Sequence, residues 1–336
     1  MHIKDFTKDD VRNVYRFLLG REPESEAVVE QHFNSCCKLS DLLQRFYRSP
    51  EFQNRIKKPQ TIDQGVLSNT EEETLALVKI DNKTFEMAGD DYLKFHIRNE
   101  FEPNMVYLSK SLINKTDNVL DIGANIGCTS ILFGGLANKV VCFEPNPSTF
   151  GFLKRNILNS KLKNIEVQNI GLGASAGEFE MAFGGNNRSG AFINDYQLAP
   201  SNHEKAKVRI ERLDDVVGKL QLSKIDFMKI DVEGFEKQVL EGAGETIEKN
   251  KPVVVLEMNH WCLNAIQRIC IPDFLDYLRS KFPILLAVEG QTYANLYDKD
   301  DSFSVMGQHI LHFKYIDIVA AFEESKLSGF RALYKK

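Results

Sequence analysis

The distribution of apolar residues along this chain changes near residue 75. Beyond that point short apolar runs recur, and the stretches between them carry apolar residues at helical spacing. The runs predict a hairpin at 75–80 and 84–87, a helix at 101–113, and strands at 118–122, 139–144, 164–169, 224–232 and 252–258. Short apolar strands that alternate with helices are typical of a parallel, doubly wound sheet, so we predict an α/β fold.

Before residue 75 the pattern is helical. Apolar residues from Val11 to Leu18 share one face of a helix that Thr7 could cap, and later apolar groups suggest three further helices up to Phe52. A polar stretch marked by Pro59 follows. We therefore predict a small all-α module at 1–60, a linker and hairpin at 61–88, and the α/β domain at 89–336.

Composition narrows the class of protein. Of the 336 residues, 43% are hydrophobic and 26% charged, as in an ordinary globular protein with a substantial core. The formal charge of -5 gives no basic field for nucleic acid or an anionic membrane. The six cysteines show no C-x-x-C spacing, which favours reduced thiols over disulfides or a zinc site. With no signal peptide pattern and no run of about 20 apolar residues, we expect a cytoplasmic protein without an integral membrane segment.

A glycine turn follows the first strand of the predicted sheet. It reads Asp121-Ile122-Gly123-Ala124-Asn125-Ile126-Gly127, and the next strand ends in a second acid, Glu144. Glycines let the backbone approach a ligand closely, and a carboxylate at the end of the second strand can bond ribose hydroxyls. The arrangement predicts a nucleoside-binding site.

The spacing of this turn bears on which nucleoside binds. A dinucleotide fingerprint requires glycines at 123, 125 and 128, but the chain has Asn125 and Cys128 at the last two. A nicotinamide-dependent oxidoreductase is therefore disfavoured. The Asp-x-Gly-x-Asn-x-Gly form instead resembles motif I of class I S-adenosylmethionine-dependent methyltransferases, whose ligand has no phosphate and carries a sulfonium and an amino group.

A second dense group of polar residues ends the strand predicted at 224–232. Strand alternation places Lys229 and Asp231 on one side, with Glu233 beside them if the register continues, and Gly234 then allows a sharp turn into a helix. The carboxyl ends of strands are where open α/β sheets bind ligands. We weigh this reading against a self-satisfied bridge between Lys229 and one of the two acids, and favour a ligand site.

Both stretches together resemble the FkbM family of methyltransferases over about residues 90–260. The most specific part is Lys229-Ile230-Asp231-Val232-Glu233-Gly234-Phe235-Glu236, and Val119–Gly127, Phe143–Pro145, Asn169–Gly173 and Arg212–Val216 also match. Members of this family are S-adenosylmethionine-dependent O-methyltransferases that act on sugars and natural-product hydroxyls. The resemblance implies a Rossmann-like, doubly wound class I methyltransferase sheet.

The resemblance also implies residue roles. The methionine end of S-adenosylmethionine would be held by Asp121, Gly123, Asn125 and Gly127, the ribose diol by Glu144, and the adenine would lie against Leu172. Asp231 and Glu233 would face the region between the sulfonium and the acceptor. The family often has Gly-Asp where this chain has Gly173-Ala174, so there is no obvious carboxylate for the adenine amino group.

A base must remove the proton of the acceptor hydroxyl. The candidate catalytic residues are Asp231, Glu233 and His260, with Lys229 beside them. His260 follows the last predicted strand and suits a base because histidine titrates near neutrality, although a structural histidine is equally compatible with its position. Trp261 offers an apolar platform for a sugar ring, but we favour core packing for it.

No metal site is predicted. His309 and His312 lack a third ligand pattern, and we interpret them as strand or surface residues. A divalent ion on Asp231 and Glu233 is chemically conceivable, but nothing in the spacing demands one. The glycine-asparagine run from Gly184 to Gly190 must be a loop, either folded over a substrate or forming an ordinary hairpin connection.

The N-terminal helices carry a resemblance of their own. Tyr15-Arg16-Phe17-Leu18-Leu19-Gly20-Arg21-Glu22-Pro23, with Ser49-Pro50-Glu51-Phe52 downstream, resembles the domain of unknown function DUF4214. That small helical domain is often attached to bacterial surface-glycan and secreted proteins. The resemblance is compatible with a glycan or protein partner, but we favour the alternative, a helical cap without a ligand of its own.

These observations predict an S-adenosylmethionine-dependent O-methyltransferase whose acceptor is a sugar in a bacterial surface glycan or glycoconjugate. The first alternative is the same chemistry on a lipid or secondary-metabolite hydroxyl. Alternatives of another class are a nicotinamide-dependent oxidoreductase and a non-catalytic interaction protein in which the N-terminal module does the binding.

Overall fold

The computed structural model divides the chain into two units, Met1–Thr70 and Glu71–Lys336, which are described separately. The residues that the structure describes are 7–15, 21–36, 38, 41–42, 45–46, 48–51, 74–89, 100–184, 187–193 and 203–336. Within these ranges no helix combines the length and the apolar character that crossing a bilayer requires.

The first unit is helical. α1 (Lys8–Val14) begins with a capping box, in which the Asp10 N–H donates to the Thr7 hydroxyl and the Thr7 N–H donates to the Asp10 carboxylate. α2 (Glu26–Ser35) follows. These helices confirm the first two predicted in this region, and the predicted linker lies outside the described residues. The small core of this unit consists of Val11, Val14, Tyr15, Val29, Cys36, Leu42 and Phe46.

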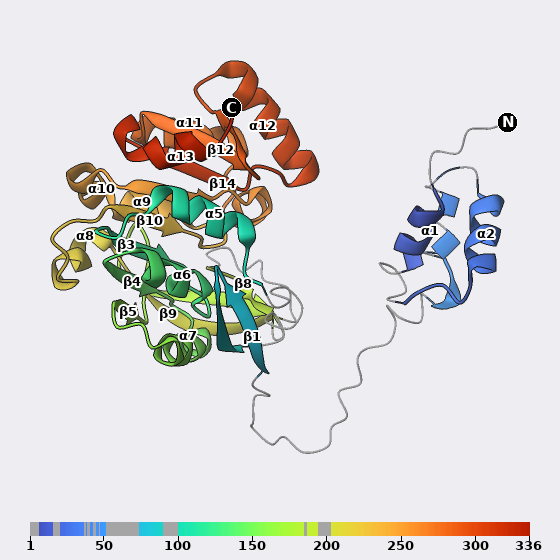
Figure 1. The fold of residues 1–336 in the computed structure, drawn as a ribbon, viewed down its shortest axis with the longest axis horizontal. Helices are drawn as coiled ribbons and strands as arrows, with labels where there is room; N and C mark the ends of the chain where they lie inside the picture. The colour runs from blue at the N-terminus through green and yellow to red at the C-terminus, as the bar shows by residue number, and fades with distance from the viewer. Residues whose placement is uncertain are drawn as a thin grey trace, which may run out of the picture. The chain divides into compact units, whose positions relative to one another are not determined.

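The second unit is built on an eight-stranded sheet with the order β13-β12-β14-β11-β10-β3-β4-β5 (Figure 1). β10 lies between β3 and β11 and is parallel to both, so the carboxyl ends of these strands share one edge. The strands are β3 (Asn118–Ile122), β4 (Lys139–Phe143), β5 (Ile165–Gln168), β10 (Phe227–Ile230), β11 (Val253–Glu257), β12 (Ile284–Glu289), β13 (Thr292–Asn295) and β14 (Asp317–Ala321). The predicted α/β, doubly wound sheet is confirmed, but it is mixed: the strands β12, β13 and β14 were not predicted, and β14 runs antiparallel to both of its neighbours.

Helices cover both faces of this sheet because its strands are apolar on both sides. One core cluster includes Phe227 of β10 together with residues of α5, α6 and α7, and the other includes Met228 and Ile230 together with residues of α8, α9 and α11. The helices are α5 (Pro103–Leu112), α6 (Cys128–Leu136), α7 (Pro147–Ser160), α8 (Leu213–Val216), α9 (Glu236–Gly242), α10 (Gly244–Asn250), α11 (Ile271–Lys281), α12 (Lys299–His312), α13 (Ser328–Leu333), a π-helix (Cys262–Ile266), and the 3-10 helices Val217–Lys219 and Glu324–Leu327.

A second, four-stranded sheet has the order β6-β9-β7-β8. Its strands are β6 (Gly171–Leu172), β7 (Gly177–Gly184), β8 (Asn187–Ile193) and β9 (His203–Glu211). β7 and β8 are antiparallel, with Gly184 opposite Asn187. The prediction that Gly184–Gly190 is a loop was wrong, because Gly184 belongs to β7 and Asn187–Gly190 to β8, while residues 185–186 lie outside the described residues.

The predicted hairpin before the main sheet is confirmed as β1 (Thr74–Ile80) and β2 (Lys83–Gly89). The buried side chain of Asn156 on α7 fixes it in place. This amide accepts from the Ala88 N–H at 2.7 Å and donates to the Ala88 carbonyl at 2.8 Å. It also donates to the carbonyl of Ile126, in the glycine turn, at 2.8 Å. One side chain therefore joins the hairpin to the turn that follows β3.

Candidate active site

The glycine turn after β3 has a backbone that side chains would obstruct. Gly123, Asn125 and Gly127 have φ angles of 86°, 49° and 96°, all in the left-handed region. A Cβ at Gly123 would lie 1.8 Å from the carbonyl oxygen of Asp231, so the turn passes directly against the end of β10. Gly127 is the N-cap of α6. The turn thus requires the glycines from which the site was predicted.

Glu144, which follows β4, contacts this turn. One carboxylate oxygen accepts from the Asn125 N–H at 3.1 Å, and the other accepts from the Asn146 N–H at 2.9 Å. Burial raises the pKa of Glu144 to about 7, although both N–H groups oppose that shift. Two oriented carboxylate oxygens at the strand end are the arrangement that a ribose diol requires.

Asp121 at the end of β3 is fully buried. Its Oδ2 accepts from the Ser130 hydroxyl at 2.6 Å, whereas its Oδ1 has no hydrogen-bond partner within the described part of the chain. Burial raises the pKa of this carboxyl, with Lys229 acting in the opposite direction. An unpaired buried carboxylate oxygen is costly unless a donor reaches it.

Leu172 in β6 is 2% exposed and packs in the core cluster that includes Met228. Its contact with adenine stays a prediction.

Lys229 and Asp231 form an ion pair at the end of β10, with Nζ and Oδ2 2.7 Å apart; the lysine side chain is 7% exposed and the aspartate side chain 31%. Burial acts to lower the pKa of Lys229, but the charges of Asp231 and Asp121 outweigh it and the pKa is raised. For Asp231, burial raises the pKa and the ammonium of Lys229 outweighs it, so the pKa is lowered. The bridge weighed in the sequence analysis is therefore present.

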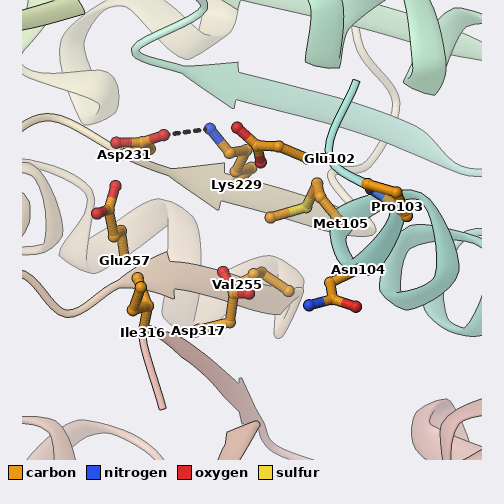
Figure 2. A pocket seen from close by; sticks show the side chains of 10 residues that line it. All are labelled: Glu102, Pro103, Asn104, Met105, Lys229, Asp231, Val255, Glu257, Ile316 and Asp317. Atoms are coloured by element: carbon orange, nitrogen blue, oxygen red, sulfur yellow. Dashed lines mark hydrogen bonds and ion pairs between the residues drawn. The ribbon is translucent and has the colours of Figure 1, made fainter. Parts of the chain in front are cut away.

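The same pair lines a cavity of about 310 Å³ (Figure 2). Its other lining residues are Glu102, Pro103, Asn104, Met105, Val255, Glu257, Ile316 and Asp317. The acids Glu102, Glu257 and Asp317 are not among the site residues that the sequence predicts. Glu257 could have been found from the sequence, because it lies at the end of a predicted strand. Asp317 could not, because no sequence pattern indicated the antiparallel strand that it begins.

The pKa values of all three acids are raised, that of Glu102 mainly by burial. Burial, followed by the charge of Asp231, raises the pKa of Glu257 well above its ordinary value. Burial, followed by the charge of Glu102, raises the pKa of Asp317 to about 7. The cavity therefore combines an ion pair that stays ionised with carboxyl groups whose pKa values are raised, so that they lose their protons at a higher pH than usual.

Glu233 lies in the turn between β10 and α9, with φ at 52°. Its Oε2 accepts from the Asn259 amide at 3.3 Å and from the Cys262 thiol at 3.2 Å. Burial and then the charge of Asp231 raise the pKa of Glu233 to about 7, and these two hydrogen bonds oppose the shift. A carboxylate with this pKa accepts a proton near neutral pH more readily than Asp231 does.

His260 takes part in a different cluster. Its backbone N–H donates to Nε2 of His309 at 3.3 Å, and its ring centroid lies 5.3 Å from that of Phe313. Neither His260 nor Glu233 is among the residues that line the 310 Å³ cavity, but Glu233 lies two residues after Asp231, which lines it. The interpretation of His309 as a strand or surface residue was wrong, because it is fully buried on α12. The prediction that Trp261 packs in the core was also wrong, because its side chain is 62% exposed.

Residues 121–283 match the family model described as the methyltransferase FkbM domain. This chain contains a methyltransferase FkbM domain. The matched span begins at Asp121 and includes all the predicted cofactor and catalytic residues. S-adenosylmethionine is the cofactor of such a domain.

The residues at the first sheet edge fit this cofactor. The left-handed glycine turn permits close approach, Glu144 presents acceptors to a diol, and the unpaired Oδ1 of Asp121 can take a cationic donor. The groups at the edge of β3 and β4 therefore fit the cofactor, and we refer to this edge as the cofactor edge; beside it lies the charged cavity, which residues of α5, β10, β11 and β14 line.

Three curated relatives resemble the domain. "Methyltransferase 1" of Beauveria bassiana is 27% identical over 45% of this chain. The hexuronic acid methyltransferase AglP of Haloferax volcanii is 27% identical over 46%, and the 2-O-methyltransferase NoeI of Sinorhizobium fredii is 30% identical over 42%. The chain covers 64%, 61% and 63% of these proteins, respectively.

Two further predictions concern metals and the N-terminal module. Among the residues that the structure describes, no group of three or more His, Cys, Asp or Glu side chains is placed to hold a metal ion. The resemblance of the first 60 residues to DUF4214, and the glycan or protein partner with which it is compatible, stay predictions.

Proposed function

We propose that this chain is an O-methyltransferase that transfers the methyl group of S-adenosylmethionine to a sugar hydroxyl in a surface glycan or glycoconjugate. The observation that carries the proposal is the position of Glu233, a carboxylate with a pKa of about 7 at the end of the strand that the cofactor turn touches. Two relatives support the choice of acceptor, since one is named a hexuronic acid methyltransferase and another a 2-O-methyltransferase.

In this proposal the residues at the two sheet edges have different roles. When bound, S-adenosylmethionine supplies an electrophilic methyl group; Asp121, Gly123, Asn125, Gly127 and Glu144 are the residues that would hold it. Glu233 accepts the proton of the acceptor hydroxyl as that oxygen becomes methylated. Asp231, fixed by Lys229, keeps negative charge close to Glu233 and so raises its affinity for the proton.

A methyl-transfer assay tests this proposal. The protein is incubated with S-adenosylmethionine carrying a ¹³C methyl group and with neutral, amino and uronic sugars and their oligomers, and new methyl groups are identified by carbon–proton correlation NMR. We expect a new O-methyl signal. Glu233→Gln should lower kcat about 10²–10⁴-fold and leave affinity for S-adenosylhomocysteine unchanged, because only the proton acceptor is lost.

The exposed Glu248 on α10 provides the matched control, and Glu248→Gln should behave like the wild type. The wild-type rate should increase as pH rises through about 7, because only the ionised form of Glu233 takes a proton. An N-methyl product, or full activity of Glu233→Gln, would contradict the proposal. A methylated lipid or secondary-metabolite hydroxyl would retain the chemistry and replace the acceptor.

A further inference from the structure

The charged cavity continues beyond the region of Asp231. A second cavity of about 170 Å³ adjoins it and shares three lining residues with it, Asn104, Ile316 and Asp317. The second cavity is completed by Leu108, Val288, Glu289, Gly290 and Phe313. The two form one groove that runs from the end of β10, past the start of α5, to the end of α12, and we refer to it as the acceptor groove.

The wall of the groove opposite α5 is held firmly. The segment from Phe313 to Ile316 is attached to three other elements, since the Tyr315 N–H donates to the Glu289 carboxylate at 2.8 Å and the Met258 N–H donates to the Ile316 carbonyl at 2.7 Å. The third contact is 2.6 Å long and joins Nδ1 of His309 to the Lys314 carbonyl. Bonds from three directions give a largely preformed site, as small-molecule sites usually are.

The far end of the groove presents an aromatic ring. Phe313 caps α12 with φ at 54°, stacks on His309 with ring centroids 5.4 Å apart, and remains 39% exposed. His309 covers one side of this ring, so an exposed part is available to a ligand. An apolar ring beside carboxylate and amide groups suits a ligand that has an apolar face and many hydroxyls.

The charges along the groove favour an uncharged ligand. Its acids are Glu102, Asp231, Glu257, Glu289 and Asp317, and Lys229 is the one cation among the residues that line the two cavities. Lys229 is already paired with Asp231. An anionic ligand would add negative charge beside five acids, and the one lysine among the described lining residues is already paired, which disfavours such a ligand.

We propose that the acceptor groove binds a neutral oligosaccharide, with the unit to be methylated near Asp231 and a further sugar unit on Phe313. This inference rests on the proposed function and extends it, because it specifies an acceptor longer than a monosaccharide and without uronic acids. The proposed acceptor therefore differs from the hexuronic acid for which the relative AglP is named.

Binding to a glycan array, with the protein saturated with S-adenosylhomocysteine, tests the proposal independently of methyl transfer. The array carries neutral and uronic glycans of one to six units. We expect retention on neutral oligosaccharides and little on monosaccharides or uronic acids. Phe313→Ala should weaken oligosaccharide binding about 3–10-fold, the loss typical of one aromatic contact, and Phe313→Tyr should restore it.

Phe303→Ala is the matched control, because Phe303 lies on the same helix, is 78% exposed and lines neither cavity. Retained affinity for S-adenosylhomocysteine shows that each variant is folded. Equal binding of monosaccharides and oligosaccharides, a preference for uronic acids, no retention of any glycan, or unchanged binding in Phe313→Ala would overturn the groove assignment. Length-dependent binding without any methyl transfer would instead overturn the proposed function and leave the groove intact.

Discussion

The two edges of the site are built in different ways. The cofactor edge comes from consecutive residues, since the turn at 121–127 lies directly after β3 and its partner Glu144 directly after the neighbouring strand. The cavity beside it is assembled from α5, β10, β11 and β14, which are far apart in the sequence. The cofactor edge depends mainly on backbone conformation and the cavity mainly on charge. Mutations in the two regions should therefore have different effects.

The largest effect should come from the shape of the cofactor edge. Gly123→Ala places a methyl group 1.8 Å from a backbone carbonyl and in a left-handed conformation, so we expect a loss of more than about 5 kcal/mol in the free energy of unfolding. Urea denaturation measures it. Gly135→Ala on α6 is the control, because nothing lies within 4 Å of its Cβ position, and it should be neutral or stabilising. A folded Gly123→Ala of normal stability would mean that the turn is not rigid.

The next largest effect should come from charge at the cavity. Lys229→Met leaves Asp231 without its partner beside other acids, and we expect a loss of about 3–5 kcal/mol in the free energy of unfolding. Lys224→Met removes an exposed lysine, 52% accessible, from Asp226 and should cost under about 1 kcal/mol. Similar losses in both variants would show that the Lys229–Asp231 pair is no more important than a surface bridge.

A smaller effect should separate binding from folding at the cofactor edge. Glu144→Ala removes the acceptors for the ribose diol, so affinity for S-adenosylhomocysteine should fall by about 1.5–3 kcal/mol, roughly 10–150-fold. Calorimetric titration measures this, with the exposed Glu178 of β7 as the site of the control substitution Glu178→Ala. Unchanged affinity would remove Glu144 from the cofactor site.

The smallest effect concerns Glu236, a buried acid beneath the turn from β10 to α9. It accepts from the N–H groups of Val232 and Gly234, and burial raises its pKa to about 8. The folded protein therefore keeps this proton above pH 4.5 while the unfolded chain loses it, so stability falls as pH rises towards 8. Glu236→Gln should remove about 1 kcal/mol of that decline between pH 6 and pH 7.

Chemical denaturation across that pH range measures this slope. Glu241 on the same helix is exposed, and Glu241→Gln should leave the slope as it is in the wild type. An unchanged slope in Glu236→Gln would indicate that Glu236 is ionised in the folded protein and is stabilised by its two N–H donors.

The contrast between the edges also explains what the sequence could predict. The parallel strands, the glycine turn and Glu144 were predictable because strand ends and left-handed glycines leave local patterns. Glu102 and Asp317 were not, since each joins the cavity through an element, α5 or β14, whose place is fixed only by tertiary contacts. The burial of Trp261 and His309 was predicted wrongly for a related reason, because burial depends on neighbours that local sequence does not specify.

Asn156 gives the cofactor turn a connection to a distant part of the chain. Its amide holds both backbone groups of Ala88 and the carbonyl of Ile126, so any opening of the hairpin end also releases the turn. Occupancy of the turn must then suppress that opening, because linkage between two sites is reciprocal. The amide hydrogen of Ala88, though it contacts no cofactor residue, should exchange with solvent more slowly when S-adenosylhomocysteine is bound, which makes the hairpin a reporter of the ligand state.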